Sequence, residues 1–191
     1  MGRPSVKAER TEVILNAFEQ CIARYGVEGT SLEMVAEASG LSRSLLRHNV
    51  GNRDAMVEAL AARFMTRSQQ ATQLMLDELP EQKPSAALLD QLFTDHPDSW
   101  QSVLVTEALI AAASRYPDVQ AQLHDWYEAF IESLTQVLVR EHPAASQSAC
   151  WDVMVAVVGI YFNTDSMRSL GLSERHRQAG LLMAQRLVES L

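Results

Sequence analysis

The sequence lacks a hydrophobic run that could cross a membrane. Its longest uninterrupted apolar stretch, Val153 to Phe162, has ten residues even with Gly159 counted, whereas a bilayer-spanning helix needs about 20. The first residues, MGRPSVKAERTEV, also lack the apolar segment of a secretory signal peptide. We therefore expect a cytoplasmic protein that does not enter a membrane.

Cysteine, glycine and proline are scarce. The 191 residues include 2 Cys, 8 Gly and 6 Pro, which excludes collagen-like and low-complexity linker proteins. Cys21 and Cys150 lie far apart, each beside apolar residues, so we expect buried free thiols and not a disulfide. The hydrophobic fraction of 47% is enough to build a core, which disfavours disorder and favours one globular domain, or one domain with a small appendage.

Common catalytic and metal-binding motifs are missing. The chain has no GxG for a dinucleotide, no GxSxG for a nucleophilic serine, and no HExxH or ExxH for a helical metal site. Its five histidines do not have the spacing of metal ligands. We therefore predict a protein that is not an enzyme and that holds neither a cofactor nor a metal.

An excess of basic residues is also missing. The net charge is −8, which at first disfavours a DNA partner because duplex DNA is a polyanion. The charge is uneven, however: residues 1–70 carry nine basic and eight acidic side chains, and residues 71–191 carry seven basic and sixteen acidic ones. Leu41–Arg53 contains three arginines and no carboxylate. This stretch is either a DNA-binding surface or simply a solvated basic face.

Helical periodicity covers nearly the whole chain, and no segment alternates like a strand. The pattern predicts an all-α fold of about nine helices. The first spans Lys7 to Tyr25 and should end at Gly26. Prolines 84, 97, 117 and 143 each precede a new periodic segment. The later helices are expected at 32–38, 42–48, 53–79, 84–95, 98–115, 117–141, 144–170 and 173–190.

The second and third of these helices form a helix-turn-helix pattern. Thr30 or Ser31 is expected to cap the first of the pair and Ser42 the second. Gly40, in the middle of the turn, should have a positive φ, which a residue with a Cβ adopts only at a cost. Val35, Leu41 and Leu46 should face the core, and this leaves polar side chains outside that can bind bases and phosphates: Ser42, Arg43, Ser44, Arg47 and His48. An ordinary helical hairpin with a polar face is the alternative.

The segment from Ile14 to Leu60 resembles the N-terminal domain of the tetracycline-repressor (TetR) family of bacterial transcription regulators. The resemblance rests on Ala17-Phe18, Tyr25-Gly26, Gly29-Thr30-Ser31, Val35-Ala36, Gly40-Leu41-Ser42 and Asn52-Arg53-Asp54. Three positions depart from the family pattern: Arg47 replaces a tyrosine, Val50 an aromatic residue and Gly51 a proline.

The resemblance implies that the third helix enters the major groove of DNA. It assigns base contacts to Arg43, Ser44, Leu45 and His48, and phosphate contacts to Thr30, Ser42, Arg47, Asn49 and Arg53. Arg3, Lys7 and Arg10 form either a flexible arm on the DNA or a merely solvated tail. Residues 1–52 would be the DNA-binding domain, and residues 53–191 would bind an effector and dimerise.

One seven-residue helix reads only a few base pairs, so we expect a homodimer on double-stranded operator DNA. The last two helices are the expected interface, through Trp151, Val155, Val158, Phe162, Leu182, Leu187 and Leu191. The alternative is that these residues fill a monomer's core.

The resemblance also implies an effector pocket, whose candidates share aromatic, Met or interrupting polar character: Met75, Phe93, Trp100, Leu104, Glu107, Trp126, Tyr127, Phe130, Met154, Tyr161 and Met167. Plain core packing is the alternative for most of them, and a solvent-facing position is the alternative for Glu107. The acidity after residue 70 mildly favours a neutral or cationic effector.

The sequence therefore predicts a ligand-responsive transcriptional regulator. We expect a repressor that binds a palindromic operator as a dimer and is released by a small molecule. The alternatives are an activator of the same fold, or a helical small-molecule-binding protein with altered DNA binding.

Overall fold

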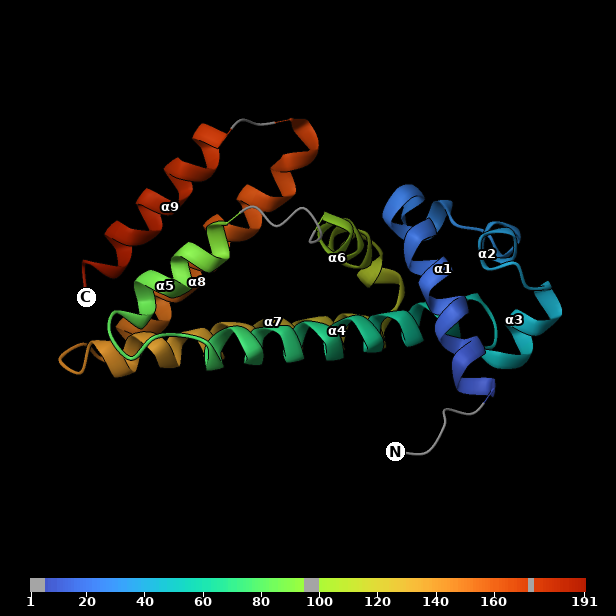
Figure 1. Cartoon of the computed structure of the whole chain (residues 1–191), viewed down its shortest axis with the longest axis horizontal. Helices are drawn as coiled ribbons and strands as arrows, with labels where there is room; N and C mark the ends of the chain where they lie inside the picture. The colour runs from blue at the N-terminus through green and yellow to red at the C-terminus, as the bar shows by residue number, and fades with distance from the viewer. Residues whose placement is uncertain (1–5, 95–99, 172–173) are drawn as a thin grey trace. The chain divides into compact units, whose positions relative to one another are not determined.

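The computed structural model describes residues 6–94, 100–171 and 174–191, and all regular structure in these ranges is helical (Figure 1). The all-α fold predicted from the sequence is confirmed. The elements are α1 (Val6–Gly29), α2 (Leu32–Ser39), α3 (Arg43–Asn49), α4 (Arg53–Asp77), α5 (Pro84–Phe93), α6 (Trp100–Ala112), η2 (Ala113–Arg115), α7 (Pro117–Glu141), α8 (Gln147–Ser166), η3 (Met167–Leu170) and α9 (Glu174–Val188).

Most expected helix boundaries agree with the structure to within a few residues, and α7 has the expected bounds. Gly26 has φ 70° and ψ 171° and interrupts α1 where the sequence predicts its end. The start expected at residue 144 is three residues too early, because Ser146 and not Pro143 marks the beginning of α8. The Ser146 hydroxyl accepts a hydrogen bond from the Ala149 N–H at 3.1 Å. The starts expected at 98 and 173 lie outside the described residues.

The chain divides into two compact units. The first contains residues 1–66 and 98–124, and the second contains residues 67–97 and 125–191. Helices α4 and α7 each begin in the first unit and end in the second. The functional boundary expected after residue 52 stays a prediction.

In the first unit, α1 packs against α2, α3 and α6 (Figure 1). Side chains from α1 to α4, among them Phe18, Val35, Leu46 and Leu60, are fully buried. The Arg63 side chain, 9% exposed, ties α4 to α1 by donating to Asn16 at 2.8 Å and pairing with Glu12 at 3.2 Å. These contacts place α3 on a packed support, with its outer face open.

The second unit has an apolar core built from α5, α7, α8 and α9, in which Leu134, Leu138, Met154 and Val157 are fully buried. Both cysteines are buried free thiols, as predicted. Gly180 lets α9 approach its neighbours closely, since a Cβ there would lie 3.0 Å from Thr164 Oγ1 and 3.1 Å from Phe93 Cε1. Among the described residues, no helix is both long and apolar enough to cross a membrane.

Candidate nucleic-acid interface

The turn between α2 and α3 depends on the backbone conformation of one glycine. Gly40 has φ 67° and ψ 16°, and its N–H donates to the Glu37 carbonyl at 3.3 Å. A Cβ at this position would meet no atom within 4 Å. Glycine is therefore favoured here by the left-handed backbone and not by lack of space. The positive φ predicted for Gly40 is confirmed.

Serine side chains cap both helices of the motif. The Ser31 hydroxyl accepts from the Met34 N–H at 3.2 Å, and the Ser42 hydroxyl accepts from the Leu45 N–H at 3.4 Å. Of the predicted core residues, Val35 and Leu46 are fully buried and Leu41 is half-buried. The caps fix where α3 begins, and therefore which of its side chains face outward.

Thr30 does not cap α2, so that alternative was wrong. It is 3% exposed, and its hydroxyl donates to the Gly26 carbonyl at 2.8 Å. The hydroxyl therefore stabilises the interruption of α1 at Gly26. The phosphate contact expected of Thr30 stays a prediction, and this burial weighs against it.

The outer face of α3 is polar and exposed, as predicted. Arg43 pairs with Glu33 of α2, with 2.5 Å between NH1 and Oε1. The hydroxyls of Ser42 and Ser44 lie 3.0 Å apart. Arg47 and His48 in the last turn are also exposed. The face carries the donors that base edges and phosphates accept.

Two other predicted phosphate ligands are engaged within the first unit. The Asn49 side-chain amide donates to the Leu45 carbonyl at 2.7 Å. Arg53 donates to the Tyr116 hydroxyl at 3.2 Å and to the Val27 carbonyl, and it pairs with Glu28 at 3.7 Å. Both phosphate contacts stay predictions, and these internal bonds weigh against them. Tyr116 lies 63 residues after Arg53 in the chain, so no local pattern could have indicated the contact.

Arg53 holds together the end of α1, the start of α4 and the start of α7. Burial raises the pKa of the Tyr116 hydroxyl, the Arg53 charge opposes this shift, and Asp54 adds to it by charge and by hydrogen bonding. Tyr116 therefore stays protonated at neutral pH and links Arg53 to Asp54.

We expect the Arg53→Ala substitution to lower the free energy of unfolding by about 1–3 kcal/mol, because it removes the hydrogen bonds that Arg53 donates to the Val27 carbonyl and to the Tyr116 hydroxyl. Glu28 keeps its ion pair with Arg115 at 2.8 Å. Urea denaturation followed by circular dichroism measures this change. Arg10→Ala is the control, since Arg10 is exposed on α1 and surface changes usually stay within about 0.5 kcal/mol. Equal effects of the two substitutions would show that Arg53 has no structural role.

Two of the three basic residues that were expected in an N-terminal arm or tail lie in a helix. Lys7 and Arg10 lie in the first two turns of α1, so they do not belong to a flexible arm. Both are exposed, and helical residues of this kind can still contact DNA. Arg3 lies outside the described residues.

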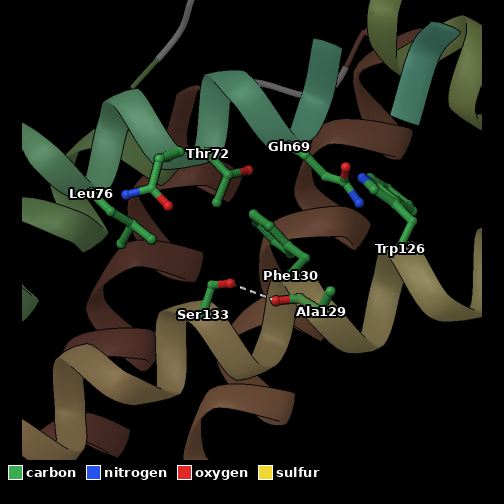
Figure 2. Close-up of a pocket in the computed structure, with 8 residues that line it drawn as sticks. Gln69, Thr72, Leu76, Trp126, Ala129, Phe130 and Ser133 are labelled. Atoms are coloured by element: carbon green, nitrogen blue, oxygen red, sulfur yellow. Dashed lines mark hydrogen bonds between the residues drawn. The ribbon is translucent and has the colours of Figure 1, made fainter. Parts of the chain in front are cut away.

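The second unit has a groove of about 230 Å³ between α4 and α7 (Figure 2). The indole N–H of Trp126 donates to the Ser68 hydroxyl at 3.0 Å, and the Trp126 ring stacks on Phe130 with 6.4 Å between centroids. The groove is lined by Gln69, Thr72, Gln73, Leu76, Trp126, Ala129, Phe130 and Ser133, and none of these is charged. The sequence did not indicate the polar members, because amides and hydroxyls on α4 and α7 resemble an ordinary solvent face.

Of the eleven predicted pocket residues, Trp126 and Phe130 line this groove. Phe93 and Met154 are buried in the core of the second unit, and Met75, Tyr127 and Tyr161 pack against that core, so core packing accounts for them. Met167 lies in η3, while Trp100, Leu104 and Glu107 belong to the first unit, where all three are half-buried.

The predicted dimer residues differ in exposure. Val158 is fully buried in the core of its own chain, which weighs against a place in an interface, and Phe162 belongs to an aromatic cluster with Trp126 and Phe130. Trp151, Leu187 and Leu191 pack partly against the same core. Val155 and Leu182 remain 38% and 46% exposed, and Met183, which the sequence did not indicate, is 39% exposed.

The chain matches no known family model and no curated protein. It does match solved structures over nearly its whole length. A TetR transcription regulator from Haloarcula marismortui aligns with a TM-score of 0.79 at 12% identity, covering 96% of this chain and 98% of that one. A Rhodococcus protein assigned to the TetR family of transcriptional regulators aligns with a TM-score of 0.76 at 20% identity, covering 94% and 98% of the two chains. GusR of Salmonella enterica aligns with a TM-score of 0.68 at 19% identity, covering 98% and 100%. The chain therefore has the all-α fold of the TetR-family transcriptional regulators.

Proposed function

We propose that this protein is a transcriptional regulator that binds operator DNA through α3. The observation that carries the proposal is the exposed face of that helix, where Arg43, Ser44, Arg47 and His48 stand outward on a buried support. The helix itself contains no carboxylate. Arginine binds guanine edges and phosphates, and serine binds either. The shared fold supports the same function.

A pair of chains is needed to read a specific site. The seven residues of α3 span about 10 Å at 1.5 Å per residue, and this covers only a few base pairs. Two copies related by a two-fold axis would read a palindrome. We assign the contact between chains to the exposed faces of α8 and α9, where Val155, Leu182 and Met183 are accompanied by the exposed small residues Ala156 and Gly159. Small residues let helices pack closely.

The groove between α4 and α7 is the proposed effector site (Figure 2). The stacked Trp126 and Phe130 rings offer an apolar surface, while Gln69, Gln73 and Thr72 offer hydrogen bonds without charge. A charged ligand would lose its hydration in the groove and would find no residue of opposite charge in this lining, which is unfavourable. The chemistry therefore favours a small neutral ligand with an apolar face and polar edges.

Helix α4 connects the proposed effector site to the DNA-binding motif. Its first residue, Arg53, is hydrogen-bonded to Val27 and Tyr116 in the first unit. Further along α4, Gln69, Thr72, Gln73 and Leu76 line the groove. A ligand that binds one position of α4 better than another shifts the equilibrium between them. Release of the operator on ligand binding follows if the favoured position alters the spacing of the two α3 helices. The same contacts would serve an activator if the operator lay upstream of the promoter.

Tryptophan fluorescence tests the proposed effector site, because Trp126 lines the groove. A neutral ligand found by thermal-shift screening should change the tryptophan emission of the wild type, and Trp126→Phe should remove most of that change. Trp100→Phe and Trp151→Phe are the matched controls, because neither residue lines the groove. If the emission change survives in Trp126→Phe, the ligand binds elsewhere.

A further inference from the structure

Arg43 and Arg47 lie one helical turn apart on the same face of α3, but they are in different electrostatic states. Arg43 is paired with Glu33 from the first turn of α2, with NH1 and Oε1 2.5 Å apart. Within the described residues, no ion pair or hydrogen bond engages the side chain of Arg47. Arg43 therefore has a carboxylate beside it on the proposed DNA-binding face, and Arg47 does not.

The Glu33–Arg43 pair is accessible to a ligand. The side chains are 62% and 56% exposed, and α2 and α3 pack as neighbours in the first unit (Figure 1). An exposed ion pair contributes little to folding stability. Its position at the start of the proposed reading helix is therefore better explained by an effect on DNA binding.

We propose that Glu33 is a specificity-determining residue, which holds Arg43 for a guanine edge and discourages its use on phosphate. This inference rests on the proposed function. Arginine has five N–H donors in a planar fork, so a carboxylate bound at NH1 leaves the donors of the remaining edge for guanine O6 and N7. The same carboxylate repels phosphate, whose negative charge is present at every sequence. A base edge carries only partial charges and is repelled much less.

Glu33 therefore acts as a positioning residue with opposite effects on two kinds of DNA. On random duplexes it lowers affinity, because Arg43 cannot neutralise a phosphate while it is paired. On the operator it preserves affinity, because the guanidinium is already oriented. Specificity is the ratio of these affinities, and a residue that weakens the wrong complex raises it.

The test compares Glu33→Gln with Glu37→Gln. Both substitutions remove one negative charge from an exposed position on α2, but among the described residues only Glu33 pairs with Arg43. Affinities for a selected operator and for random duplex DNA are measured at several salt concentrations. We expect Glu33→Gln to bind random DNA several-fold more tightly than the wild type. Its affinity should also fall more steeply with salt concentration, by about 0.9 in the slope of log affinity against log salt per α3 helix. Its affinity for the operator should rise less than its affinity for random DNA, or should fall. Glu37→Gln should leave the ratio of operator affinity to random-DNA affinity unchanged.

Two further readouts separate positioning from a general charge effect. In an Arg43→Ala background, Glu33→Gln should no longer change the ratio, because the two residues act as a pair. Binding-site selection with Glu33→Gln should relax the same base position that Arg43→Ala relaxes. The inference is overturned if Glu33→Gln and Glu37→Gln change the ratio alike, or if the effect persists without Arg43. A wild type with no preferred sequence would instead overturn the proposed function.

Discussion

The Arg43→Ala, Arg47→Ala double variant should lose operator binding by two or more orders of magnitude. Both side chains are exposed on α3, and each occurs twice in a dimer, so the substitutions remove four contacts from one complex. A bidentate arginine–guanine contact discriminates by about 1–3 kcal/mol, and each lost phosphate contact weakens binding further. Fluorescence anisotropy with labelled operator measures the loss, and circular dichroism should show unchanged helicity.

The matched control is Arg140→Ala with Arg175→Ala, which changes the net charge equally at exposed positions on α7 and α9. It should bind the operator nearly as well as the wild type. The two single variants should also differ from each other. Arg43→Ala should relax preference at one base position, and Arg47→Ala should weaken binding at all sequences and reduce the salt slope by about 1. If the control loses affinity as strongly as the double variant, long-range charge and not α3 governs binding.

The Val155→Asp, Leu182→Asp double variant should convert a dimer into monomers. Both side chains are exposed in the isolated chain, so the carboxylates are tolerated before association. In an apolar interface each would be buried without a partner, which is strongly unfavourable. Sedimentation should show the 21.2 kDa chain where the wild type sediments as a species of twice that mass. Operator affinity should fall as well, because each half-site alone offers only a few base pairs.

Leu74→Asp with Ile110→Asp is the control for the dimer. These side chains are 63% and 54% exposed and lie on α4 and α6, outside the assigned interface. This variant should remain a dimer. A wild type that sediments as a monomer would contradict the assigned interface directly, and a control that also dissociates would place the interface elsewhere.

Local signals in the sequence were sufficient to predict the helix-turn-helix. Gly40 marks a left-handed turn, Ser42 caps α3, and Asn52 accepts from the Ala55 N–H at 2.9 Å at the start of α4. Each signal acts within three or four residues, so it can be identified without knowing the fold. At α8 two signals competed, and the sequence interpretation took Pro143 where Ser146 is the cap.

Long-range packing could not be predicted in the same way. Helix α8 is apolar on most of its surface, and which side meets its own core depends on where α5, α7 and α9 pack. For this reason Val158 was expected at an interface but is buried, whereas Val155 is exposed. The family resemblance assigned Arg53 to a phosphate, but its contacts to Val27 and Tyr116 arise only in the folded unit.

Selection from a pool of random duplex DNA with the wild-type protein tests the central claim most directly. Bound duplexes are recovered at physiological salt and sequenced. We expect enrichment of a palindrome whose half-sites lie about one helical turn apart, or a multiple of it, with a guanine at the position that Arg43→Ala relaxes. Recovery of no sequence above the starting pool would contradict the proposal that this protein recognises an operator.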